Sequence, residues 1–136
     1  GNNNVFWSTP RSAARFGLMI SRGGVWEDQT ILNDTAYMQA MINTSQNINP
    51  SYGYLWWLNG KSAAVFPGST SAIPVAVAPN APADLYCAMG KNGQFIGIVP
   101  SKGLVYVRMG DAPDNSLVPI MFHNQMWEKL NNVLNE

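Results

Sequence analysis

The chain has 136 residues, enough for one domain with a packed core, and 46% of them are hydrophobic. Lysine and arginine together number 8, as do aspartate and glutamate, so the formal net charge is zero. This balance argues against a nucleic-acid partner, because a phosphate-binding surface needs an excess of basic residues. Only 12% of the residues are charged, about half the usual share. We therefore expect another polypeptide to cover part of the surface.

One cysteine and one histidine restrict the metal and redox chemistry of the chain. Cys87 has no second cysteine for an intramolecular disulfide or a cysteine-based zinc site, and His123 alone cannot make a histidine-rich metal site. We therefore expect no metal and no other cofactor. No apolar run is long enough to span a bilayer. The polar start opens with Gly1, shows no signal peptide and suggests a processed or recombinant piece of a longer protein.

Two helices are predicted in the N-terminal part of the chain. The first begins at Ser8-Thr9-Pro10, because a hydroxyl can cap the free amides and proline suits the first helical position. It ends at Gly23-Gly24, since glycine accepts the left-handed conformation that follows a last turn. The second helix is predicted from Asp34 to about Asn43, and the polar residues 44–51 form a loop.

Strands are predicted next. The aromatic residues at 52–57 favour a strand, and Asn59-Gly60 is a two-residue hairpin signal that pairs it with a return strand at 63–66. Residues 69–83 are rich in Ser, Ala and Pro and predict an irregular connection with at most a short strand. A three-strand meander follows, and its short turns force antiparallel pairing. Its strands are predicted at 85–89, 94–99 and 104–109.

A closing helix is predicted over residues 117–134. Its apolar face is expected to lie on the sheet and comprises His123, Met126, Trp127, Leu130, Val133 and Leu134. The fold class is therefore α+β: an antiparallel sheet with a C-terminal helix on one face and two N-terminal helices. We treat residues 1–136 as a single unit with helices in 1–51, the sheet in 52–116 and the last helix in 117–136.

The side chains offer little self-contained catalytic chemistry. A hydrolase needs a nucleophile and an activating base, yet neither Gly-x-Ser-x-Gly nor Ser-x-x-Lys occurs. His123 could act as a base, but its position on the apolar face of the predicted last helix favours a packed or capping histidine. Cys87 lies inside a predicted strand, which favours a buried thiol over a reactive one. The carboxylates at 27–28 and 111–114 are typical of turns.

Three stretches nevertheless resemble the C-terminal half of the serine β-lactamase and penicillin-binding-protein superfamily, in particular its class C β-lactamase-like branch. They follow the order and spacing of the family over most of residues 5 to 110. The family has an aspartate where this chain has Ser12. The stretches are STPRSAARFGL at 8–18 with GGVW at 23–26, YGYLWW at 52–57 with FPG at 66–68, and AMGKNGQ at 88–94 with VPS at 99–101 and VYVRMG at 105–110.

The third stretch carries the candidate site. Lys91-Asn92-Gly93 resembles the Lys-Thr-Gly or His-x-Gly triad of the family, which implies a strand edge lining an active site. The resemblance implies that Lys91 directs positive charge toward a substrate carboxylate and that Asn92 replaces a hydroxyl as a hydrogen-bond donor. Gly93 would let the substrate approach the backbone, and the amide of Gln94 would supply half of an oxyanion hole. The same tripeptide is also good chemistry for a surface hairpin turn with no function.

The resemblance implies a parent serine hydrolase that acts on amide or ester bonds through an acyl-enzyme, in the periplasm or cell envelope. The Ser-x-x-Lys nucleophile motif of the family would lie upstream of residue 1, so we expect this chain alone to be inactive. The implied partners are a small-molecule or peptide substrate, and either the missing N-terminal part or a second copy in a homodimer.

Two alternatives remain open at this point. The chain could be a non-catalytic binding or assembly module on the same scaffold, which Asn92 in place of the hydroxyl residue favours. It could also be an unrelated α+β domain whose aromatic strand at 52–57 binds an apolar or sugar ligand. For that strand, a simpler reading is that the aromatic residues fill the core.

Overall fold

The computed structural model describes residues 6–113 and 115–134 and has an α+β architecture. Strands β3, β4, β5 and β6 form a four-stranded antiparallel sheet in that spatial order, and β1 and β2 form a separate two-stranded sheet. The helices are α1 (Pro10–Ser21), α2 (Thr35–Met41) and α3 (Ile120–Leu134). The strands are β1 (Val25–Trp26), β2 (Gln29–Thr30), β3 (Trp57–Leu58), β4 (Tyr86–Met89), β5 (Phe95–Val99) and β6 (Leu104–Arg108).

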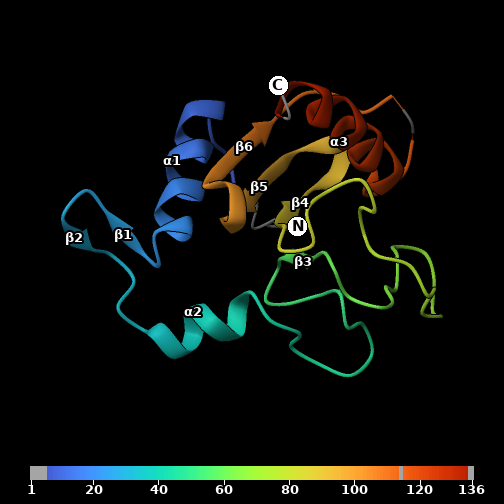
Figure 1. The fold of residues 1–136 in the computed structure, drawn as a ribbon, viewed down its shortest axis with the longest axis horizontal. Coiled ribbons are helices and arrows are strands. Elements are labelled where there is room, and N and C mark those ends of the chain that lie inside the picture. The colour runs from blue at the N-terminus through green and yellow to red at the C-terminus, as the bar shows by residue number, and fades with distance from the viewer. Residues whose placement is uncertain (1–5, 114, 135–136) are drawn as a thin grey trace.

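The main sheet lies between two helical layers (Figure 1), with α1 on one face and α3 on the other. Successive side chains of a strand point to opposite faces, so neighbouring residues of β5 enter different cores. Ile98 packs in the cluster that contains Ile20 of α1, whereas Val99 packs in the cluster that contains Trp127 of α3. Every residue of β5 is buried, which makes this strand the centre of the molecule.

Two glycines allow the layers to approach closely. A Cβ atom at Gly17 of α1 would lie 2.7 Å from Cγ1 of Val105, so only glycine lets the helix settle on β6 at this distance. A Cβ atom at Gly97 of β5 would lie 2.1 Å from ring carbons of Tyr106, its cross-strand neighbour. Gly97 therefore makes room for the Tyr106 ring beneath α3.

The capped first helix and the meander confirm the sequence predictions. The Thr9 side chain accepts a hydrogen bond from the Ser12 amide (3.2 Å) at the start of α1. At its end, the Gly23 amide donates to Ile20 (3.0 Å) and the Gly24 amide to Met19 (3.0 Å), a Schellman motif. Strands β4, β5 and β6 pair antiparallel through short turns, with bounds within one residue of those predicted.

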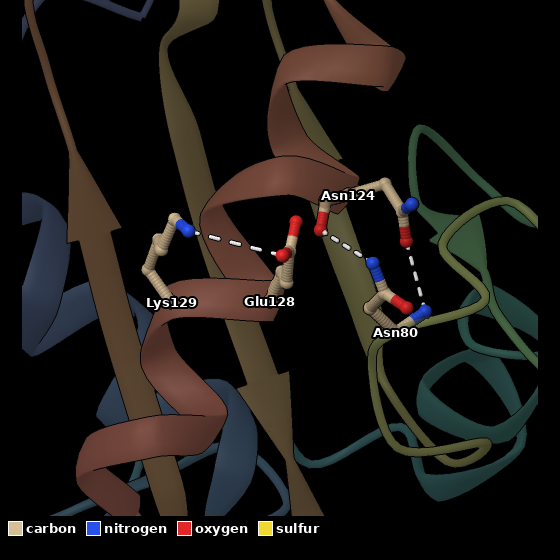
Figure 2. Close-up of polar contacts among 4 residues, drawn as sticks. All are labelled: Asn80, Asn124, Glu128 and Lys129. Carbon is tan, nitrogen blue, oxygen red and sulfur yellow. Dashed lines mark hydrogen bonds and ion pairs between the residues drawn. The ribbon is translucent and has the colours of Figure 1, made fainter.

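Helix α3 is held against the loop that precedes β4 as well as against the sheet. The Asn80 main-chain amide donates to Oδ1 of Asn124 (2.8 Å), and Nδ2 of Asn80 donates to the Asn124 carbonyl (3.3 Å), so Asn80 is the donor in both bonds (Figure 2). The nearby ion pair between Glu128 and Lys129 (3.8 Å) joins two exposed side chains and contributes little to stability. Of the predicted apolar face, Val133 (70% exposed) and Leu134 (38% exposed) do not pack in the core, so the prediction is wrong for these two residues.

The predicted hairpin across Asn59-Gly60 is wrong. Trp57 and Leu58 pair with β4, 28 or more residues along the chain, and the 63–66 segment forms only an isolated bridge from Ala64 to Ile73. The reason lies in the buried Asn59 side chain. Its Nδ2 donates to the carbonyls of Ala78, Ala81 and Pro82 (2.9–3.2 Å), and its Oδ1 accepts from the Ala78 amide (2.9 Å). Asn59 thus organises the 78–82 loop instead of turning a hairpin.

Three smaller differences from the prediction concern the bounds of two helices and one short hairpin. Helix α2 ends at Met41, two residues early. Helix α3 begins at Ile120 instead of residue 117, because Pro119 disfavours helical backbone at the residue before it. The short hairpin of β1 and β2 was not predicted; residues 27–28 form its turn, with Glu27 at a φ of 52°.

We expect Asn59→Asp to lower the free energy of unfolding by about 3 kcal/mol or more. The substitution replaces the donor by a carboxylate that faces three carbonyl oxygens in a buried site. Urea denaturation at pH 7 measures the change. The matched control is Asn131→Asp, which loses one exposed hydrogen bond to Asn80 and should cost under about 1 kcal/mol. Equal costs for the two substitutions would contradict the role given to Asn59.

Candidate functional site

A cavity of about 650 Å³ opens at the end of the main sheet where β4 leads into β5. The segment before α1, the loop before β3 and the ends of β4, β5 and β6 all contribute to its wall. Most of the wall is apolar, and it contains no aspartate or glutamate among the described residues. The large apolar contributors are Phe6, Trp7, Leu55, Met89, Phe95 and Met109.

The sequence-predicted site residues divide between the cavity and its surroundings. Lys91 and Gln94 line the cavity, whereas Asn92 and Gly93 are not among its lining residues. The resemblance implies a strand edge, but Lys91–Gly93 forms a 3-10 turn and β5 begins only at Phe95. Asn92 has a φ of 61° and is exposed, while Gly93 has a φ of 85° and is buried. The tripeptide is therefore a turn whose first residue borders the cavity.

Arg108 holds this turn against the loop that follows β6. Its Nη1 donates to the Gly93 carbonyl (3.0 Å) and more weakly to that of Asn92 (3.4 Å). The guanidinium also donates to the carbonyls of Gly110 and Asp111. Its Cζ lies 4.9 Å from the centroid of the Phe122 ring of α3, within range of a cation–π contact. The planar guanidinium of arginine holds several N–H donors in a fixed arrangement, which suits hydrogen bonds to several carbonyls at once.

The side chain of Gln94 completes the same connection. Its Nε2 donates to the Gly110 carbonyl (2.8 Å), and its Oε1 accepts from the Gly110 amide (3.2 Å). The Gly90 amide donates to the Gln94 carbonyl (2.8 Å) and closes the turn. We call Arg108 and Gln94, with the carbonyls that they hold, the turn clamp. The sequence analysis missed this function of both side chains.

Lys91 carries the free positive charge of the cavity. Lys91 and Arg108 are the only basic residues in the described wall, and the Arg108 guanidinium is engaged by four carbonyls. Lys91 is exposed, and within residues 6–113 and 115–134 no hydrogen bond or ion pair engages its ammonium. The cavity therefore combines an apolar wall with one available cation.

His123 and Cys87 lie away from the cavity, in the layer between the sheet and α3. The Trp127 indole donates to the Tyr106 hydroxyl (3.2 Å), which lies 2.5 Å from Nε2 of His123 and 3.7 Å from Sγ of Cys87. Burial lowers the pKa of His123 to about 4 and raises the pKa of Cys87 to about 12. Both residues are buried, as predicted, and at pH 7 neither an imidazolium nor a thiolate forms here.

The described residues do not assemble a nucleophile and base in the cavity. Ser8 borders it, but its hydroxyl donates to the Thr9 carbonyl (3.1 Å) and has no basic partner. No group of three potential metal ligands occurs among the residues that the structure describes. No helix in that same part of the chain is long and apolar enough to cross a membrane. The arrangement can bind and orient a ligand, and it lacks the groups for acyl transfer.

Comparisons with protein-family models and with curated proteins find no match for this chain.

We expect Arg108→Lys to accelerate hydrogen exchange at the Gly110 amide about tenfold or more, because an ammonium cannot replace the planar fork that holds four carbonyls. Exchange measured by NMR tests this. Arg22→Lys, an exposed substitution at the end of α1, is the matched control and should leave Gly110 unchanged. Unaltered exchange at Gly110 in Arg108→Lys would count against the turn clamp.

His123 should make the protein sensitive to acid. Its folded pKa of about 4 lies below the ordinary value of 6.5, so the unfolded chain binds the proton more readily as the pH falls from about 6.5 to about 4. The free energy of unfolding that the neutral His123 contributes above pH 6.5 is therefore lost as the pH falls through this window. Urea denaturation across the window should show a loss about 3 kcal/mol larger for the natural chain than for His123→Gln. Parallel pH profiles for the two proteins would contradict burial of a neutral imidazole.

Proposed function

We propose that the chain is the C-terminal segment of a serine hydrolase with a partial β-lactamase or transpeptidase-like fold, and that its cavity is half of the substrate cleft. One observation carries this proposal. Each of the three stretches that resemble the family contributes to the same cavity, although they lie far apart in the sequence. The contributors are Ser8 from the first stretch, Tyr52 and Leu55 from the second, and Ala88 to Lys91, Gln94, Arg108 and Met109 from the third.

The proposed roles follow the positions of the side chains. Lys91 borders the cavity and has no partner among the described residues, which supports a role in attracting a substrate carboxylate. Gln94 also borders the cavity, and two hydrogen bonds with Gly110 fix its side chain. This anchoring would hold the backbone N–H of Gln94 in place as an oxyanion donor. Such a donor contributes about 3 kcal/mol to transition-state stabilisation. Asn92 and Gly93 do not line the cavity, so their proposed contacts with substrate rest on the resemblance alone.

The rest of the cleft and the nucleophile would come from an upstream part of the parent protein, acting on amide or ester bonds in the periplasm or cell envelope. Strand β6 is an edge strand of the sheet formed by the described residues. An edge of five residues is a natural place for further strands to pair. The missing N-terminal part is the proposed partner, and a homodimer is the other arrangement that would cover this edge.

A non-catalytic binding or assembly module is the second candidate. It is favoured by the absence of an activated nucleophile among the described residues and by the exposed apolar side chains at the cavity rim. Both candidates use the same cavity, but only the hydrolase requires a nucleophile upstream. The upstream coding sequence therefore distinguishes them.

The experiment extends the chain by its natural upstream reading frame and compares it with the 136-residue protein. Burst acylation by a fluorescent penicillin is the measurement. We expect an upstream Ser-x-x-Lys motif and one acyl group per molecule in the extended protein, and no burst from the 136 residues alone, because they lack the nucleophile and its base.

Lys91→Ala in the extended protein should slow acylation ~30-fold, the effect expected when a charged contact to substrate is lost. Lys102→Ala is the matched control, since Lys102 is an exposed lysine in the turn between β5 and β6, at the other end of the sheet. A burst from the short chain, or an inert extended chain without Ser-x-x-Lys, would overturn the hydrolase proposal.

A further inference from the structure

We infer that the cavity binds a monoanion with an extended apolar chain, of the medium-chain alkanoate type. This inference rests on the proposed function, because it names the class of compound that the same cleft takes. Three independent features of the wall support it: its exposed apolar side chains, a strained residue at its rim and the number of its free charges.

Large apolar side chains that face solvent gather at this cavity. Trp7 is 89% exposed, Leu55 78% and Phe6 67%, and all three belong to its wall. Exposed apolar side chains that cluster in a concavity mark a binding surface, whereas single ones scattered over a protein need no explanation. Met89 of β4 and Phe95 of β5 also belong to the wall and add to its apolar surface. A ligand with a long apolar portion would cover this whole surface.

The backbone at the rim is strained where it presents one of these side chains. Leu55 has a φ of 65°, a left-handed conformation that is unfavourable for a residue other than glycine. Backbone strain of this kind concentrates at ligand sites, where the surroundings over-determine the conformation. Here the strained residue holds an apolar side chain out at the cavity mouth, so its conformation favours contact with a ligand.

The charged donors that stay free in the described wall favour a monoanion. No acidic residue lines the cavity, so a cationic ligand has no partner in its described wall. Of the two basic residues, Arg108 is saturated by carbonyls of the turn and of the following loop. Lys91 alone offers an ammonium. One ammonium complements one carboxylate, whereas a phosphate dianion needs several donors arranged around it.

The size of the cavity suits such a compound. Its volume of about 650 Å³ falls within the range of roughly 300–1,000 Å³ that small-molecule sites occupy. Methionine side chains at 89 and 109 can adapt to a flexible chain, since the thioether is unbranched and rotates freely. The inferred ligand therefore lays its chain against the methionines and aromatic rings and its carboxylate beside Lys91.

The test is isothermal titration calorimetry of the 136-residue protein with dodecanoate, below the concentration at which it forms micelles. We expect one dodecanoate per molecule, and an affinity about tenfold weaker in Lys91→Ala. Lys102→Ala, the exposed lysine at the opposite end of the sheet, should bind like the natural chain. Dodecanol, which lacks the charge, should bind about tenfold more weakly than dodecanoate and with the same affinity in Lys91→Ala and the natural chain. Acetate, which lacks the apolar chain, should not bind.

Three results would overturn the inference: no heat of binding, equal affinity in Lys91→Ala and the natural chain, or many chains per protein molecule as in nonspecific association. These outcomes are separable from failure of the proposed function. Binding of dodecanoate without acylation of the extended protein would remove the hydrolase and keep the ligand class. Acylation without dodecanoate binding would keep the hydrolase and remove the ligand class.

Discussion

The structure depends on burial of strand β5 from both sides. Its five residues are all buried, with α1 packed on one face of the sheet and α3 on the other. This arrangement requires two glycines, because a side chain at Gly17 would push α1 away from Val105 and one at Gly97 would collide with Tyr106. Once β5 is fixed in this way, the turn that enters it from β4 has a fixed position too. The cavity lies at that turn.

The turn clamp extends this order from the sheet to the site. Arg108 and Gln94 tie the turn to the loop after β6, so residues 93–94 are held at the end of the sheet where the cavity lies. The clamp also determines which cation is available to a ligand. Because main-chain carbonyls occupy the Arg108 guanidinium, Lys91 is the cation left free in the described part of the wall. A structural contact thus sets which charge a ligand meets. Apolar side chains of the segment before α1 then complete the wall.

The parts of the fold that local chemistry determines could be predicted from the sequence. The Thr9 cap, the glycine pair after α1 and the glycine-containing turns of the meander each act within a few residues, and the structure has all of them. The hairpin across Asn59 could not be excluded from local signals. The carbonyls that hold its side chain lie 19 to 23 residues further along the chain.

The candidate site shows the same division. The order of motifs along the chain predicts Lys91 and Gln94 as site residues; both border the cavity, and their roles stay predictions. Arg108 was missed as the partner of the turn because its contacts arise from the pairing of β5 with β6. The available signal was the predicted meander, in which Arg108 lies opposite Phe95, the residue after Gln94. For Leu55 no sequence signal exists, since nothing in its neighbours predicts a positive φ.

The central claim is that the end of the sheet, with Lys91 as its free cation, is a ligand-binding site. The most direct test is to map amide and indole chemical shifts by NMR as the protein is saturated with dodecanoate. We expect the largest changes at residues 88–96 and at the indole of Trp7, with little change at His123 and Trp127 of α3. Changes centred on α3, or spread evenly over the surface, would contradict it.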